Sequence, residues 1–193
     1  VSTPASGGGG GVLAVVIDLL PGASRTATFG ADGGAWWGGG NGSNGPDGGL
    51  FNAATNLSGV GPISGFASPF TGQLVGVFIE AGDISALGAP SALSYPDAAS
   101  LQQASYAPGL RQVFYIGDGL TGTGSGSTQS FAVPDGAAKL VLGIADGFAF
   151  AGAPGWYDDN TGGYDVDYSI VPAPGAMALV GVGGVMAASR RRR

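Results

Sequence analysis

Glycine limits what this chain can fold into more than any other residue, because it accounts for 40 of the 193 residues. Glycine weakens the interior of a helix or strand through its backbone entropy, so this content favours short elements joined by many turns. Disorder would be the simplest reading, but 44% of the residues are hydrophobic, which argues against it. A turn-rich all-β domain satisfies both observations, and the length predicts a single domain with a real core.

Short apolar runs bounded by turn residues predict the strands. Residues 12–20 end at a Pro-Gly pair and predict a buried strand, which would form a hairpin with a second strand over residues 25–29. Residues 73–80 are apolar on both faces and predict a central strand covered on both sides. Further strands are predicted over residues 63–70, 112–116, 129–133, 138–145 and 164–170, with residues 129–145 forming a hairpin across Pro134 to Gly136.

About eight strands and no long helical run indicate an all-β fold, specifically a jelly-roll-like β-sandwich. Only residues 98–106 could hold a short helix within it. We expect residues 1–11 to be a flexible leader, residues 12–170 to form the sandwich, and residues 171–193 to be a separate tail with a short hydrophobic helix. Because the chain begins at Val1 and not at methionine, we also expect a processed form or a fragment.

Composition excludes several classes of function. The chain has no Cys and no His, so disulfides, His-ligated zinc and Ser-His catalysis are excluded. Outside the terminal arginines, the basic residues are Arg25, Arg111 and Lys139, against 13 acidic groups. Such a balance disfavours a phosphate-binding surface, so we expect no nucleic-acid partner.

Two glycine-rich motifs are interpreted as chance matches. Residues 117–122 form a GxGxxG pattern, but a dinucleotide site needs a helix next, and residues 123–128 contain only Gly, Ser and Thr. Residues 39–44 resemble one calcium nonapeptide repeat, whereas a repeat solenoid requires several copies.

Residues 146–168 carry the candidate site. Oxygen-bearing side chains gather there on a backbone shaped by glycine and proline, which is the arrangement that a hard cation such as calcium needs. They are Asp146, Asp158, Asp159 and Asn160, interspersed with Gly147, Gly152, Pro154 and Gly155. From Tyr164 onward apolar and polar residues alternate, so a half-buried strand is expected to hold the acidic loop in place.

The order Asp146, Pro154-Gly155, Asp159-Asn160, Thr161-Gly162 and a closing strand resembles the calcium loop of the calcium-dependent galactophilic lectins of bacteria, which are jelly-roll sandwiches. The resemblance implies calcium binding by the side chains of Asp146, Asp159 and Asn160 and by the carbonyls of Trp37 and Trp156. The segment between Asp146 and Pro154 is longer than in that family.

A second part of the resemblance lies in the loop predicted over residues 30–49. Trp37-Gly38 and Pro46-Asp47 match an aromatic calcium ligand and a turn beside the sugar. The resemblance therefore implies ligand binding by Pro46, Asp47, Asp146, Trp156, Asp159 and Asn160. Gly45 and Gly48 replace the sugar-contacting His and Gln of the family. Trp36 and Trp37 could equally plug one end of the sandwich.

The tail after Ile170 has a different composition. The motif Val171, Pro172, Ala173 and Pro174 precedes an apolar segment of about 13 residues, shorter than the roughly 20 that span a bilayer. The chain then ends in Arg190, Arg191, Arg192 and Arg193. This order resembles the PEP-CTERM sorting signal of Gram-negative bacteria. The resemblance implies an inner-membrane anchor, cleavage by an exosortase membrane protease, and display on the cell surface or in the extracellular matrix.

Three functions are weighed. The first is a calcium-dependent carbohydrate-binding protein whose partner is a sugar or exopolysaccharide. The second is a structural matrix protein in which calcium only fixes the loop. The third is a glycoside hydrolase using Asp158 and Asp159, which is disfavoured because adjacent residues on an extended chain point in opposite directions. We therefore expect a binding protein and not an enzyme.

Overall fold

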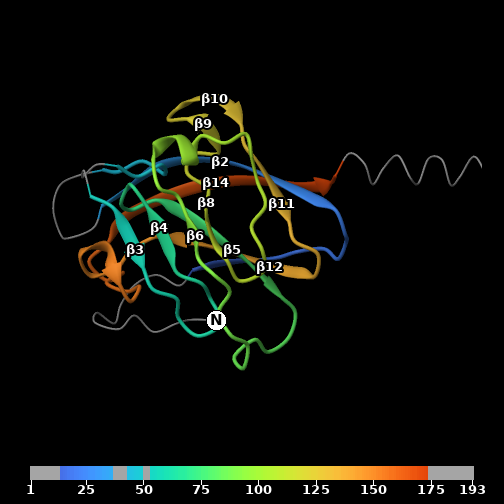
Figure 1. Cartoon of the computed structure of the whole chain (residues 1–193). Helices are drawn as coiled ribbons and strands as arrows, with labels where there is room; N and C mark the ends of the chain where they lie inside the picture. The colour runs from blue at the N-terminus through green and yellow to red at the C-terminus, as the bar shows by residue number, and fades with distance from the viewer. Residues whose placement is uncertain (1–13, 37–42, 50–52, 174–193) are drawn as a thin grey trace, which may run out of the picture.

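The computed structural model describes residues 14–36, 43–49 and 53–173 (Figure 1). These residues form short strands and two short 3-10 helices, η1 (Ala98–Leu101) and η2 (Phe148–Phe150). The strands are β1 (Val15–Asp18), β2 (Arg25–Trp36), β3 (Thr55–Leu57), β4 (Phe66–Ser68), β5 (Leu74–Glu80), β6 (Leu93–Ser94), β7 (Ser105–Tyr106), β8 (Val113–Tyr115), β9 (Leu120–Gly122), β10 (Ser125–Thr128), β11 (Ser130–Val133), β12 (Ala137–Ile144), β13 (Ala151–Gly152) and β14 (Thr161–Pro172). The predicted all-β class is confirmed.

The strands form three four-stranded sheets and one hairpin. The first sheet has the order β1-β12-β5-β8, the second β14-β2-β11-β7 and the third β13-β3-β4-β6, while β9 and β10 pair separately. One apolar core joins the first and second sheets and is built around Phe29, Phe78, Phe114 and Phe131. A smaller core joins the first and third sheets through residues that include Leu57, Phe66, Val75 and Tyr115. The first sheet is therefore covered on both faces.

Strand β5 lies at the centre of this arrangement, as predicted. Leu74 and Phe78 belong to the larger core, whereas Val75 on the opposite face belongs to the smaller one. Phe78 stacks on Phe114 with ring centroids 5.0 Å apart. A strand that is apolar on both faces thus forms where two layers cover it.

Three antiparallel pairings are nested within one another along the chain. Strand β1 pairs with β12, β2 with β11, and β5 with β8. The two predicted hairpins are therefore wrong, because the turns at residues 21–24 and 134–136 each cross from one sheet to the other. Buried Arg25 links these turns by donating hydrogen bonds to the carbonyls of Leu20 and Ala137.

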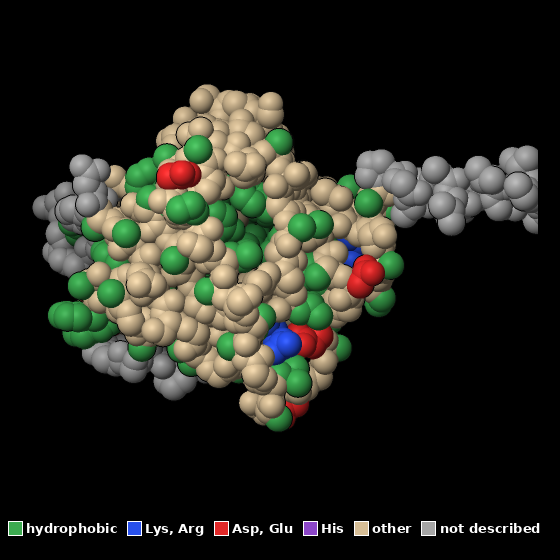
Figure 2. All heavy atoms as spheres, viewed as in Figure 1, with side chains coloured by type: hydrophobic (Ala, Val, Ile, Leu, Met, Phe, Trp, Pro, Cys, Tyr) green, Lys and Arg blue, Asp and Glu red, His purple; other side chains and the backbone are tan. Residues whose placement is uncertain are grey.

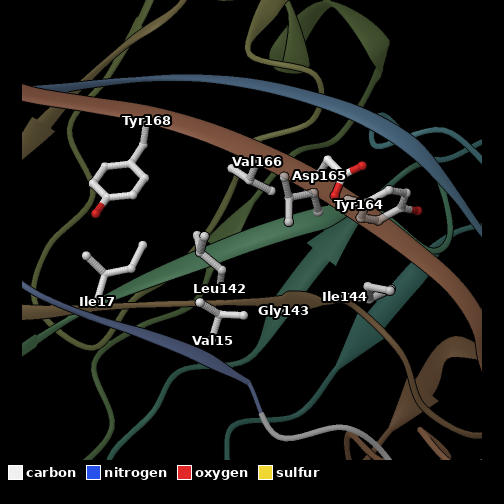
Figure 3. A pocket seen from close by; sticks show the side chains of 10 residues that line it. Val15, Ile17, Leu142, Gly143, Ile144, Tyr164, Asp165, Val166 and Tyr168 are labelled. Atoms are coloured by element: carbon white, nitrogen blue, oxygen red, sulfur yellow. The ribbon is translucent and has the colours of Figure 1, made fainter.

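Strand β1 is an exposed edge and not the buried strand that was predicted. Val15 is 59% exposed and Val16 is 45% exposed. The reason is that β1 pairs with β12 alone and faces β14 across a hollow of about 310 Å³ (Figure 3). The apolar run therefore lines an open side of the sandwich, with Ile17 and Tyr168 on opposite walls (Figure 3).

Strands β2 and β14 pair along twelve residues and run side by side across the domain (Figure 1). The loop predicted over residues 30–49 is therefore wrong in its first part, since β2 continues to Trp36. Glycines permit this pairing: a Cβ on Gly33 would lie 2.7 Å from the carbonyl oxygen of Gly163, and one on Gly162 would lie 2.2 Å from that of Gly34. A sequence that reads as a loop is here a closely packed strand.

The second half of the GxGxxG segment is β9, the first strand of the β9-β10 hairpin, and no helix follows it, which agrees with its interpretation as a chance match. Gly117 and Gly119 both have positive φ, and a Cβ on Gly119 would lie 2.0 Å from the carbonyl oxygen of Phe29. The helix considered over residues 98–106 is only η1, capped by Asp97, whose side chain accepts from the Ser100 amide.

Charged side chains are sparse on the face shown in Figure 2, and the blue side chains there lie beside red ones. Among the described residues, Arg111 pairs with Glu80 at 3.1 Å and Lys139 with Asp18 at 2.7 Å.

Candidate metal centre

The candidate site lies in residues 146–160, which connect β12 to β14 at the end of the domain opposite the C-terminal end of β14 (Figure 1). Asp146 lies two residues after Ile144, the last residue of β12. A bridge pairs Gly147 with Pro154, and the Gly155 amide donates to the Asp146 carbonyl at 3.2 Å. The residues between Gly147 and Pro154 form an excursion that begins and ends at this bridge. Asp146 therefore lies next to Pro154 and Gly155 despite the long segment between them.

The excursion between Gly147 and Pro154 is anchored to the third sheet. Strand β13 pairs with β3, and the Ser58 amide donates to the Gly152 carbonyl at 2.7 Å. At its base, a Cβ on Gly147 would lie 2.9 Å from the carbonyl oxygen of Ala153, so glycine permits this close approach.

Asp146 and Asn160 are in direct contact. Asp146 is 3% exposed, and its Oδ2 accepts from Nδ2 of Asn160 at 2.8 Å. Its Oδ1 accepts from the amide of Gly147 at 2.7 Å. The two residues are 14 positions apart in the sequence, and this hydrogen bond places them side by side.

Two oxygen atoms at this site are buried without a hydrogen-bond partner among the described residues. They are Oδ1 of Asp159 and Oδ1 of Asn160. Burying an unpaired acceptor costs free energy, about 1–3 kcal/mol from mutational data. The Asn160 amide directs its donor to Asp146 and leaves its acceptor free, which suits a cation. Calcium prefers oxygen ligands of this kind, so the candidate ligands are these two atoms and the carboxylate of Asp146.

The electrostatics of the site also favour a bound cation. Burial raises the pKa of Asp146 to about 6, the hydrogen bonds from Asn160 and Gly147 oppose the rise, and the charge of Asp159 adds to it. Burial raises the pKa of Tyr157 to about 12, and the Asp146 charge contributes. Two carboxylates in a partly dry loop therefore repel each other, and a divalent cation would relieve that repulsion.

Trp156 contributes backbone and ring to the site. It has a positive φ of 67°, and its carbonyl lies within 3.5 Å of the Asp159 amide. A hollow of about 290 Å³ is lined by Asp146, Asp159, Trp156 and residues 147–150. Trp37, the other predicted carbonyl ligand, lies outside the described residues. Strand β2 ends beside the site at Trp36, whose register partner is Thr161.

The turn containing Pro46 and Asp47 has an internal role. Asp47 is buried, and its Oδ1 accepts from the Tyr115 hydroxyl at 2.6 Å and the Asp118 amide at 2.8 Å. Burial and the Asp47 charge raise the pKa of Tyr115, so its phenol stays protonated and continues to donate. The Pro46 carbonyl accepts from the Leu74 amide at 2.9 Å.

The turn that contains Pro46 and Asp47 contacts residues 71–73, which lie directly before β5. Ala145, the residue before the acidic loop, contacts the same segment. Gly48 packs on Thr71 and Gln73, and the Gln73 carbonyl accepts from the Ala145 amide at 2.9 Å. Gly48 has a φ of +76°, and a Cβ there would lie 2.5 Å from the Thr71 carbonyl oxygen and from Cγ of Gln73. Gly48 therefore has no room for the Gln of the lectin family, whereas a Cβ on Gly45 would meet nothing within 4 Å.

One feature of the site was missed from the sequence. Phe148 is 66% exposed, and its ring lies 5.1 Å from that of Trp156. An apolar residue in a loop rich in glycine was the available signal.

Asp158, considered for hydrolysis, is exposed, whereas Asp159 is partly buried. Within the described part of the chain, no group of three or more His, Cys, Asp or Glu side chains is clustered. The candidate set therefore depends on an amide and on carbonyls as well as carboxylates.

The start of the predicted sorting motif belongs to the domain. Val171 and Pro172 end β14, paired with Thr26 and Arg25, and the Ala173 amide donates to the Ser24 carbonyl at 2.5 Å. Pro174 and Arg190 to Arg193 lie outside the described residues. Within the described ranges, no helix has the length and apolar character needed to cross a membrane.

No protein-family model, curated protein or solved structure matches the chain.

Proposed function

We propose that this chain is an exported cell-surface or matrix protein with a calcium-dependent carbohydrate-binding domain. The observation that carries the proposal is the pair of buried, unpartnered oxygens on Asp159 and Asn160 beside the buried carboxylate of Asp146.

Calcium fits these residues better than a transition metal does, because the donors are all oxygen. Asp146, Asp159 and Asn160 would hold the ion through side chains, and Trp156 and Trp37 through their carbonyls. Calcium takes 6–8 oxygen ligands, so a bound sugar could supply two of them as vicinal hydroxyls. The chain's own contribution is to keep the carboxylates and the amide in place through the Gly147-Pro154 bridge and the Asp146-Asn160 contact.

The topology supports the jelly-roll part of the proposal. A jelly roll is two Greek keys in which a long antiparallel pair of strands is wrapped into two sheets. The nested pairings of β1 with β12, β2 with β11 and β5 with β8 are of this kind. The resemblance to the bacterial lectins points the same way.

The tail supports the export part of the proposal. The Val-Pro-Ala-Pro motif, the apolar segment and four terminal arginines occur in the order typical of an exosortase substrate. The chain would be held transiently in the inner membrane and then released to the surface or matrix, where calcium is plentiful. The sugar partner would be a surface glycan or exopolysaccharide.

A structural role for calcium without sugar binding is the second candidate. Asp47 engages Tyr115 and Asp118, and glycines occupy the two positions where the lectin family contacts its sugar. These features favour weak and broad sugar binding over galactose specificity, or a domain in which the ion only fixes the loop.

The test is a glycan array with and without chelator, on the wild type and on the double variant Asp159→Ala with Asn160→Ala. We expect binding to sugars with vicinal diols that disappears with chelator and in the variant. Binding that ignores both changes contradicts the calcium-bridged mechanism. No binding to any glycan favours the structural role.

A further inference from the structure

The residues that lengthen the acidic loop place an aromatic surface next to its oxygen atoms. Phe148 lies two residues after Asp146, inside the excursion that leaves the loop at Gly147 and returns at Pro154. Hydrophobic side chains project at the left edge of Figure 2, where the orange 146–156 segment of Figure 1 lies. The excursion therefore adds an aromatic residue beside the site without breaking the Asp146-Asn160 hydrogen bond.

Phe148 and Trp156 form a pair at this position. Their ring centroids are 5.1 Å apart with an interplanar angle of 40°, and Phe148 is 66% exposed. A lone exposed apolar residue is ordinary on a protein surface. This one packs against a second aromatic ring, and both belong to the same 290 Å³ hollow as Asp146 and Asp159.

The backbone that presents the pair is strained. Ala149, Phe150 and Trp156 have positive φ values of 50°, 55° and 67°. Non-glycine residues rarely occupy this region, and it persists only where the surrounding structure imposes it. Here two contacts hold the excursion in this conformation: the pairing of β13 with β3 and the Gly147-Pro154 bridge. Strain of this kind clusters at ligand-binding sites.

The hollow thus combines two chemical surfaces. One wall carries the carboxylates of Asp146 and Asp159, with Asn160 in contact with Asp146 behind it, and these groups suit a cation and, through it, hydroxyl groups. The other wall is aromatic. A pyranose ring has the matching character, because one edge carries hydroxyls while one face presents C–H groups that pack on aromatic rings.

We propose that Phe148 and Trp156 form a stacking platform for the C–H face of a pyranose whose vicinal hydroxyls point toward the oxygens of Asp146, Asp159 and Asn160. This inference rests on the proposed function, since it assumes a calcium-bridged sugar at the same loop. It adds the ligand class, which is a cyclic sugar and not any diol. It also assigns selectivity to Phe148 and Trp156 in place of the positions occupied by Gly45 and Gly48.

The test compares cyclic and acyclic ligands that carry the same kind of diol. Methyl β-galactopyranoside, methyl α-mannopyranoside and the open-chain polyol galactitol are titrated into the full chain in saturating calcium. The variants are Phe148→Ala and Phe148→Tyr, with the calcium-induced rise in Tm recorded for each as the measure of an intact metal site.

We expect the wild type to prefer at least one pyranoside over galactitol. Phe148→Ala should bind that pyranoside about tenfold more weakly, the upper range of one aromatic contact, while its galactitol affinity and its calcium response stay unchanged. Phe148→Tyr should retain the preference.

Three results would overturn the inference. Equal pyranoside affinity in Phe148→Ala and wild type removes the platform but leaves calcium-dependent sugar binding in place. An equal loss for pyranoside and galactitol means that Phe148 only supports the loop. No pyranoside binding to the wild type in calcium removes both the platform and the sugar-binding part of the proposed function.

Discussion

Nδ2 of Asn160 donates to Oδ2 of Asp146 over 2.8 Å, and this contact leaves Oδ1 of Asn160 buried without a partner among the described residues. The amide thus uses its donor for the protein, and its acceptor is available to the proposed ion. The same contact fixes the end of the loop to its beginning, so the proposed metal site and the closure of the loop depend on one pair of residues.

Calcium should raise the melting temperature, because an ion that binds only the folded state stabilises it by mass action. At a calcium concentration of about 100 Kd the gain is about 2.7 kcal/mol, which corresponds to roughly 5–10 °C for a chain of this size. Calorimetry with and without chelator measures it. The double variant Asp159→Ala with Asn160→Ala should lose the response, and the exposed neighbour Asp158→Ala should keep it. A calcium response in the double variant would remove these residues from the site.

The stability of the calcium-free protein should fall with rising pH because of Asp146. Its pKa is raised in the folded state to about 6, so the folded state retains a proton that the unfolded state loses near its normal pKa of about 3.9. The stabilising contribution is complete below pH 4 and is lost as the pH rises through 6. Tm measured in chelator from pH 4 to 7 should therefore decline in wild type relative to Asp146→Asn. A constant difference between the two proteins across that range would contradict this assignment.

Calcium affinity should show the opposite dependence on pH. The ion needs the ionised carboxylate, so protonation of Asp146 competes with binding. Titration calorimetry should give weaker calcium binding at pH 5 than at pH 7, with proton release on binding near pH 6. Affinity that is independent of pH over this range would show that Asp146 is not a ligand.

The two glycines that replace sugar-contacting residues of the lectin family should respond differently to replacement. Gly48→Gln should destabilise the fold by about 1–3 kcal/mol, because position 48 has positive φ and no room beside Thr71 and Gln73. Gly45→His should be tolerated within about 0.5 kcal/mol, since a Cβ there meets nothing within 4 Å. Urea denaturation of both variants measures the difference. Equal stability would mean that the turn adapts to a side chain at position 48.

Truncation should locate the boundary between domain and tail. A chain ending at Ala173 should remain folded and no longer fractionate with membranes, whereas one ending at Ile170 should be less stable because the register pairs of Val171 and Pro172 are lost. Cell fractionation and thermal denaturation of the two truncations test this. Equal stability of the two would restrict the domain to residues before Val171, and membrane retention of both would count against the sorting signal.

The sequence predicted the central strand and the acidic loop because both depend on local patterns. β5 is apolar on both faces, and Asp146, Asp159 and Asn160 lie in one segment whose beginning and end are joined by the Asp146-Asn160 hydrogen bond. The pairing of strands was not predictable in this way. The turns at residues 21–24 and 134–136 look like hairpin turns, but sheet membership is decided by which core the strands bury, and the pattern of a single strand does not contain that information.

The exposed edge and the long β2 strand were missed for related reasons. β1 has the composition of a buried strand, and only its position at the edge leaves Val15 open to solvent. β2 contains glycines that read as a loop, yet they permit close contact with β14. The signal for Phe148, an apolar residue in a glycine-rich segment, did not predict its exposure, because such a residue is as consistent with a core position as with a binding surface.

Strand β14 has a mechanical consequence. It begins at Thr161, directly after Asn160, and ends at Pro172, directly before the tail, so about 40 Å of extended chain separates the proposed glycan site from the proposed anchor. Tension between a bound polysaccharide and a fixed surface would travel along the backbone of this one strand. The hydrogen bonds to β2 lie across that direction and would be loaded together in shear. A cell held by such a contact in flowing water would load the proposed site and the β2-β14 pair, whereas the first and third sheets lie outside that line.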